Sequence, residues 1–154
     1  SNFKCFFIGG PSGKSGDEYL EELKKSIKEL DLVSHVEFLD NLSQSKIKEL
    51  LNRSKLLLHT SKFETFGLVA IEANSMGVPV LTTNRGSLVE IIEDNINGFL
   101  SENLVESKVN TIVNDLLYDE SYFQEIMHNC IDKSLKYDWQ NTANSIEKLY
   151  EAFA

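Results

Sequence analysis

Short runs of apolar residues alternate along the chain with longer segments in which apolar residues recur at the period of a helix. The short runs have the length of β-strands, and the longer segments have the spacing of amphipathic α-helices. The predicted strands are 3–8, 35–39, 55–59 and 78–82. The predicted helices are 17–30, 43–53, 66–76, 86–92, 105–117, 121–136 and 138–152. This alternation predicts an α/β fold in a single domain over residues 1–154, with a Rossmann-like parallel sheet and helices on both faces.

Polar loops follow the predicted strands. They are Gly9–Gly16, Asp40–Leu42, Thr60–Glu64 and Thr83–Gly86. Because parallel sheets bind ligands at the carboxyl ends of their strands, we expect a ligand site at this edge.

The segment from Glu64 to Glu72 carries two carboxylates eight positions apart, joined by an apolar run that opens with Phe66-Gly67. If a helix begins near Thr65 or Phe66, its first amides have no partner within the helix and favour a phosphate there. Glu64 then lies just before the helix and Glu72 two turns inside it, about 10 Å further along the axis. A diphosphate at the helix start would leave one carboxylate near a hexose and the other near a ribose, each accepting hydrogen bonds from hydroxyl groups.

An ordinary interpretation of Glu64 stays open, because a carboxylate before a helix also favours the helix dipole without binding any ligand. Glu72 is harder to explain in that way. It lies in the otherwise apolar stretch Gly67–Ala73, where an unpaired carboxylate is costly.

The segments Ser61–Ala73 and Met76–Val80 resemble the donor-binding half of the family 4 retaining glycosyltransferases (glycosyl transferases group 1), which have the two-domain GT-B fold. The resemblance covers nearly the whole chain. Further segments occur in the order typical of that family: Gly9–Pro11, Val36–Leu39, Gly86–Glu90 and Asn97–Leu100.

The resemblance implies a role for each residue of the motif. Glu64 would act at the catalytic centre by binding hydroxyls of the transferred sugar, the amides of Phe66–Val69 would meet the diphosphate, and Glu72 would hold the ribose. Leu42 would lie beside the base, although a hydrophobic contact with the following helix explains it equally well. The implied donor-binding residues are Leu42, Glu64, Thr65, Phe66, Gly67, Leu68, Val69 and Glu72. The family retains anomeric configuration, and the departing diphosphate helps to deprotonate the acceptor.

The resemblance also implies that the chain is the C-terminal donor-binding domain of a larger enzyme. An N-terminal domain would bind the acceptor glycan, and an Arg and a Lys from an upstream segment would complete the phosphate contacts. We therefore expect no sugar transfer by this chain alone. The last helix, with Trp139 and Tyr150, resembles the segment that crosses towards the N-terminal domain, and ordinary core packing is the alternative.

Composition limits the function classes. The chain has 154 residues, 42% of them hydrophobic, and a net charge of −9 with few Arg, which argues against nucleic acid as a partner. No run is long enough to span a membrane, so we expect a cytoplasmic enzyme, with peripheral association of the full-length protein at the inner face of the membrane. Cys5 and Cys130 have no metal-ligand spacing and are expected to be free, buried thiols. We expect no metal and no cofactor apart from the donor substrate.

Two motifs that suggest other chemistry do not support it. Gly13-Lys14-Ser15 ends like a phosphate-binding P-loop, but the glycine required five positions before Gly13 is Ile8. His59 ends a predicted strand without a partner at a recognisable spacing, so we interpret it as a structural residue.

The sequence thus predicts a donor-binding domain that serves transfer of a hexose or N-acetylhexosamine from a UDP-sugar to a glycan, in bacterial surface-polysaccharide synthesis. Richness in Asn, Ile, Lys and Ser suggests this setting. The alternatives are a non-catalytic Rossmann-like binding or regulatory domain, and another GT-B enzyme such as a phosphorylase or an epimerase.

Overall fold

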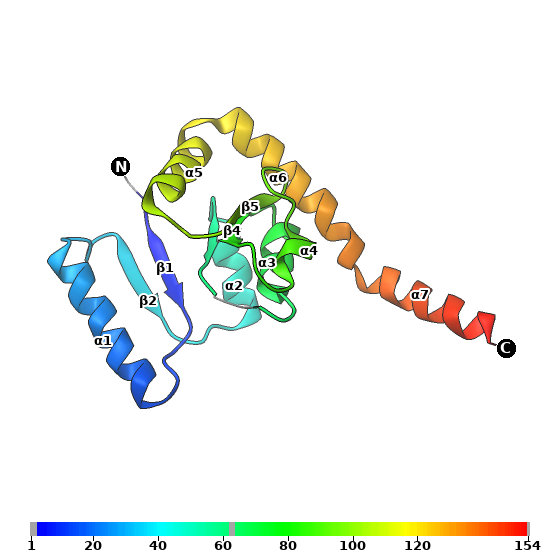
Figure 1. Cartoon of the computed structure of the whole chain (residues 1–154), viewed down its shortest axis with the longest axis horizontal. Coiled ribbons are helices and arrows are strands. Elements are labelled where there is room, and N and C mark those ends of the chain that lie inside the picture. Colours follow the sequence, from blue (N-terminus) through cyan, green and yellow to red (C-terminus); the bar gives the residue numbers. More distant parts are fainter. Residues whose placement is uncertain (1–2, 62–63, 154) are drawn as a thin grey trace. The chain divides into compact units, whose positions relative to one another are not determined.

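A computed structural model describes residues 3–61 and 64–153 of the chain (Figure 1). The chain divides into two compact units, residues 1–47 and residues 48–154, with the boundary inside helix α2 (Gln44–Leu51). Each unit is described by itself.

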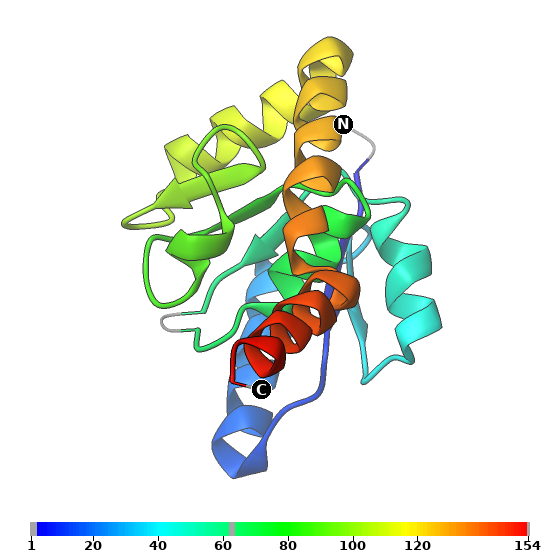
Figure 2. The ribbon, with the colours of Figure 1, turned by 90° about the vertical axis from the view of Figure 1, so that its right-hand side faces the viewer.

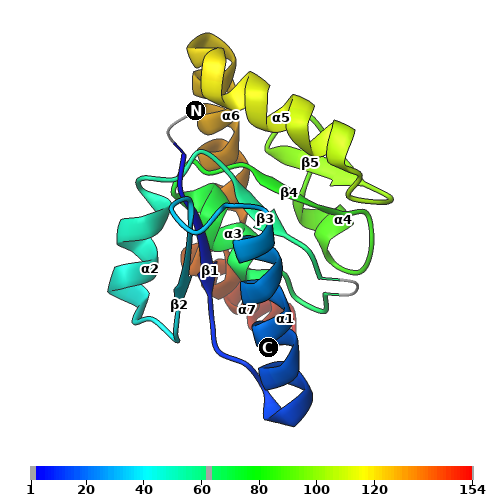
Figure 3. The ribbon, with the colours of Figure 1, turned by 90° about the vertical axis from the view of Figure 1, so that its left-hand side faces the viewer.

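Unit 1 is a strand–helix–strand element. Strand β1 (Cys5–Ile8) pairs in parallel with β2 (Val36–Leu39), and helix α1 (Gly13–Glu29) is the crossover between them (Figure 3). Helix α1 begins four residues earlier than predicted, so only Gly9–Ser12 separates it from β1.

Unit 2 contains a three-stranded parallel sheet. Its strands are β3 (Leu57–His59), β4 (Val80–Thr83) and β5 (Gly98–Ser101), in the order β3-β4-β5. Helix α3 (Leu68–Ser75) connects β3 to β4, and the short helix α4 (Leu88–Ile91) connects β4 to β5. The α/β class with parallel strands, predicted from the alternation of periods, is confirmed.

Three helices complete unit 2. Helix α5 (Glu106–Tyr118) is followed by α6 (Glu120–Ser134), a 3-10 turn η1 (Leu135–Tyr137) and α7 (Trp139–Ala152). The side chains of Asp119 and Asp138 cap α6 and α7, each accepting a hydrogen bond from a first-turn amide. Figure 2 shows α6 (orange) leading through a bend into α7 (red).

The hydrophobic core lies in unit 2, between strands β4 and β5 and helices α5 and α6. Its buried members are Leu81, Phe99, Ile112, Leu116, Phe123, Ile126 and Cys130. Burial raises the pKa of the Cys130 thiol to about 12, so this cysteine behaves as an apolar core residue, as predicted. Cys5 is exposed, so the prediction of a buried thiol there is wrong. It lies in β1 of unit 1, whose described residues are all at least partly exposed.

Candidate functional site

Two loops meet at the carboxyl edge of the three-stranded sheet. Strands β3 and β4 are parallel, with His59 opposite Thr82, so the chain leaves both strands on the same side. The loop after β3 leads to Glu64, and the loop after β4 contains Arg85 and Gly86. Within unit 2 this agrees with the edge predicted for the site. Lys62 and Phe63 of the motif lie outside the described residues.

Helix α3 begins at Leu68, two residues later than predicted. Gly67 precedes it with φ +72°, and a Cβ on Gly67 would lie 2.6 Å from Cδ1 of Ile91. The left-handed backbone conformation therefore favours a glycine here. Glu72 consequently lies about 6 Å along the axis from Leu68, little more than one turn inside the helix rather than two.

The Glu64 carboxylate accepts hydrogen bonds from two backbone amides that precede α3. Its Oε1 accepts hydrogen bonds from the amides of Thr65 (2.9 Å) and Phe66 (3.2 Å). Hydrogen bonds from the amides of Phe66, Gly67 and Thr65, with a smaller effect of His59, lower the pKa of Glu64 below its ordinary value. Glu64 is therefore ionised near neutral pH.

The amides of Leu68 and Val69 are differently placed. As the first two residues of α3 they have no acceptor within the helix, and no residue of the described part of the chain accepts a hydrogen bond from them. Of the amides predicted to meet the diphosphate, Phe66–Val69, those of Leu68 and Val69 are therefore free of the Glu64 carboxylate.

The loop after β4 holds the backbone of Glu64. The amide of Ser87 donates to the Glu64 carbonyl at 3.0 Å, and a Cβ on Gly86 would lie 2.2 Å from the same oxygen. The Thr83 hydroxyl, at the end of β4, donates to the carbonyl of Ser61 in the same loop as Glu64, at 3.0 Å. The sequence prediction missed these supports, although a glycine in a loop, such as Gly86, is one signal for close backbone approach.

His59 lies at the site rather than apart from it. Its Nε2 is 3.6 Å from Oε2 of Glu64, and its Nδ1 is 3.5 Å from Oγ1 of Thr82. The interpretation of His59 as a structural residue stays a prediction, and its contacts now include Glu64.

The other predicted residues differ in exposure. Glu72 is half-buried, and no hydrogen bond or ion pair to its carboxylate occurs within the described part of the chain. Phe66 and Leu68 are exposed, and Val69 is half-buried. Leu42 is half-buried in unit 1, between β2 and α2, and its contact with the base remains a prediction.

Residues 1–137 match the family model described as glycosyl transferases group 1. The chain belongs to this family. It is 26% identical over 150 residues to the D-inositol 3-phosphate glycosyltransferase of Acidothermus cellulolyticus, covering 97% of this chain and 33% of that protein. It is 40% identical over 99 residues to the alpha-1,3/1,6-mannosyltransferase of Mus musculus, covering 63% of this chain and 24% of that enzyme.

Solved structures with a similar fold agree with the assignment of the chain to the glycosyl transferases group 1 family. The Anabaena protein HepE in complex with UDP is similar, with a TM-score of 0.87, 26% identity and coverage of 97% of this chain and 41% of that one. Its complex with UDP-glucose gives a TM-score of 0.83. The fold is that of the C-terminal domain of a GT-B glycosyltransferase. The chain spans about a third of the length of the D-inositol 3-phosphate glycosyltransferase of A. cellulolyticus, at 33%.

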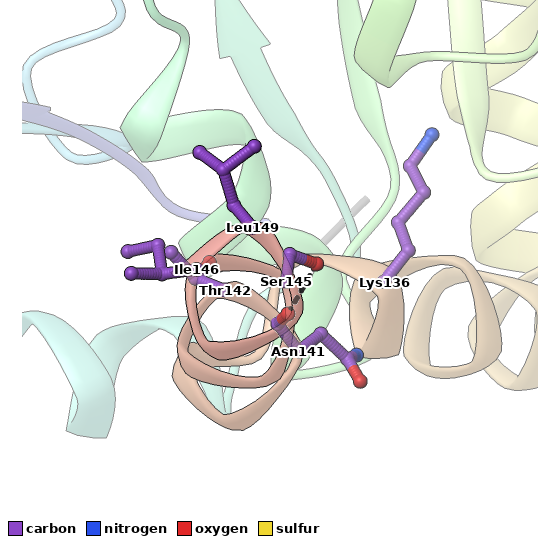
Figure 4. Close-up of a pocket in the computed structure, with 6 residues that line it drawn as sticks. All are labelled: Lys136, Asn141, Thr142, Ser145, Ile146 and Leu149. Atoms are coloured by element: carbon purple, nitrogen blue, oxygen red, sulfur yellow. Dashed lines mark hydrogen bonds between the residues drawn. The ribbon is translucent and has the colours of Figure 1, made fainter. Parts of the chain in front are cut away.

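Other kinds of site find no support in the described residues. No group of three or more His, Cys, Asp or Glu side chains in residues 3–61 and 64–153 is arranged to hold a metal ion. Over the same residues, no helix combines the length and apolar character needed to cross a bilayer. A surface hollow lined by η1 and α7 residues, including Ile146 and Leu149, shares no residue with the Glu64–Glu72 segment (Figure 4).

Proposed function

We propose that this chain is the nucleotide-sugar-binding domain of a retaining glycosyltransferase that uses a UDP-sugar. The observation that carries the proposal is the start of α3, where the free amides of Leu68 and Val69 lie between the carboxylates of Glu64 and Glu72. Amides at a helix start favour a phosphate, and carboxylates favour sugar hydroxyls. The similarity to HepE in complex with UDP-glucose supports the same type of ligand.

In this proposal each group contacts one part of the donor. Glu64, ionised and held by two amides through Oε1, accepts hydrogen bonds from hexose hydroxyls through Oε2. Leu68 and Val69 donate to the diphosphate, and Glu72 accepts hydrogen bonds from the ribose hydroxyls. Leu42 packs beside the base.

The reaction would proceed mainly by positioning and by stabilisation of leaving-group charge. The helix start stabilises the diphosphate as it departs, and the diphosphate takes the proton of the attacking acceptor hydroxyl. The attack would occur on the same face of the sugar, so the anomeric configuration is retained. We propose that this chemistry needs no metal ion.

The acceptor and the setting follow from resemblance rather than from the geometry. We propose a glycan acceptor, bound by an N-terminal domain of the whole enzyme, and transfer of a hexose or N-acetylhexosamine in bacterial surface-polysaccharide synthesis. The whole enzyme would work in the cytoplasm, at the inner face of the membrane.

Titration of the chain with UDP and UDP-glucose, followed by amide chemical shifts in NMR spectra, tests the proposal. Glu72→Gln should weaken both ligands about tenfold or more, because both contain the ribose and a hydrogen bond to a charged group contributes about 1.5–3 kcal/mol. Glu64→Gln should weaken UDP-glucose and leave UDP nearly unchanged.

Glu125→Gln, an exposed change on α6, is the matched control and should alter neither affinity. The proposal fails if neither ligand shifts the amides of Leu68 and Val69 at millimolar concentration. It also fails if Glu72→Gln binds both ligands as the wild type does.

A further inference from the structure

His59 connects the buried edge of the sheet to the Glu64 carboxylate. It is the last residue of β3, and its partner across the sheet is Thr82 of β4. The side chains of His59 and Glu64 are 16% and 26% exposed, so each is partly shielded from water.

The hydrogen-bonding capacity of the three groups indicates how the ring is oriented. A carboxylate can only accept hydrogen bonds, so a proton on Nε2, the ring nitrogen that faces Glu64, is the arrangement that suits this contact. In the tautomer with its proton on Nε2, Nδ1 is an acceptor, and the Thr82 hydroxyl can donate to it. Thr82 is fully buried at 0% exposure, and its hydroxyl contacts the His59 ring. A buried hydroxyl is costly without a partner, so Thr82 favours this orientation of the ring.

The two carboxylate oxygens of Glu64 have different surroundings. Oε1 is held by the amides of Thr65 and Phe66, whereas Oε2 faces only the His59 ring at 3.6 Å among the contacts of the described residues. That distance is too long for a direct hydrogen bond. Oε2 therefore keeps its capacity to accept a hydrogen bond from a ligand, while the ring restricts where it can move.

We infer that His59 is a positioning residue that fixes Oε2 of Glu64 for the hexose hydroxyls of the donor, with Thr82 holding the ring in turn. The inference rests on the proposed function, because it assigns Glu64 to the sugar. It adds a specific consequence. Replacement of His59 should lower the affinity for UDP-glucose and leave the affinity for UDP unchanged.

The test compares UDP with UDP-glucose for His59→Phe, which keeps a ring but has no nitrogen. UDP-glucose affinity should fall about 3- to 10-fold, as expected when the hydrogen bond between Glu64 and the hexose is weakened, while UDP affinity stays within about twofold. His59→Gln can still direct an N–H at Glu64 and should recover most of the lost affinity. His128→Gln, a change of an exposed histidine on α6, is the control and should alter neither affinity.

The outcomes separate this inference from the proposed function. If Glu64→Gln loses the preference for UDP-glucose but His59→Phe keeps it, the inference is wrong and the proposed function stands. If His59→Phe weakens UDP and UDP-glucose equally, the role of His59 is only structural. If the wild type does not distinguish the two ligands and Glu64→Gln changes nothing, the assignment of Glu64 itself fails.

Thr82→Val provides a second variant should His59→Phe fold poorly. Valine has nearly the shape of threonine but cannot donate to Nδ1, so the ring loses its orienting contact. The ratio of UDP to UDP-glucose affinity should change in the same direction as for His59→Phe, by a smaller factor. An unchanged ratio in a folded Thr82→Val chain would overturn the inference.

Discussion

At the scale of single residues, contacts hold both the backbone and the side chain of Glu64. Its carbonyl is held by Ser87, its Oε1 by two amides, and its Oε2 faces His59. Each of these contacts either favours the ionised form of the carboxylate or has no effect on its ionisation, and none requires a proton on it. The pKa of Glu64 is accordingly lowered, chiefly by hydrogen bonds from backbone amides.

The lowered pKa predicts how stability depends on pH. Above the ordinary pKa of 4.5 the carboxylate is ionised in the folded and unfolded states, and its stabilising contribution is complete. As the pH falls below 4.5 through the folded-state pKa, that contribution is lost. The difference in free energy of unfolding between the wild type and Glu64→Gln should therefore shrink as the pH falls through this range.

Urea unfolding of both chains between neutral and acidic pH measures this difference, and Glu125→Gln shows the behaviour of an exposed glutamate. The amide shifts of Thr65 and Phe66 report the titration of Glu64 directly. A midpoint at or above 4.5 at these amides would contradict the contacts described.

At the scale of elements, a buried pair of asparagines joins α3 to the turn before β5. Asn74 donates to the carbonyls of Val78 and Asn97, and Asn97 donates to the Asn74 side chain at 2.7 Å and to the carbonyl of Ile91. Both residues are 1% exposed. Because α3 carries the free amides and Glu72, this pair helps to fix the helix on which the candidate site is built.

Asn74→Leu should destabilise the chain by about 2–4 kcal/mol, because it leaves several buried groups without a hydrogen-bond partner. Denaturant unfolding at neutral pH measures the loss. Asn144→Leu, at an exposed position of α7, is the control and should stay within about 0.5 kcal/mol of the wild type. A loss as small as that of the control would show that the buried network does not hold α3.

The same elements show how much the sequence can predict. The types and order of helices and strands follow from periodicity, because an apolar stripe has to match the geometry of its element. The start of α3 does not follow, because it depends on the positive φ of Gly67, which the apolar pattern of the segment does not record. The contacts of His59 and Ser87 with Glu64 were not predicted either, because they depend on how two parallel strands bring their loops together, which no local pattern records.

At the scale of the whole molecule, charge opposes the proposed ligand. The chain has a net charge of −9, and a UDP-sugar is an anion. The proposed contacts with its diphosphate are amides at the start of α3, which act over a short range, whereas the repulsion by the whole chain acts over longer distances. The two effects should respond differently to salt.

We therefore expect the affinity of the chain for UDP-glucose to stay constant or to increase by up to about twofold as salt rises from about 20 to about 300 mM, because the Debye length shortens and the long-range repulsion is screened. Titrations at several salt concentrations measure this, with uncharged uridine as the control for effects unrelated to charge. A site built on clustered Lys and Arg would behave in the opposite way, since its affinity for an anion falls steeply with salt. A steep fall for UDP-glucose would mean that cations, rather than the amides of Leu68 and Val69, dominate binding of the diphosphate.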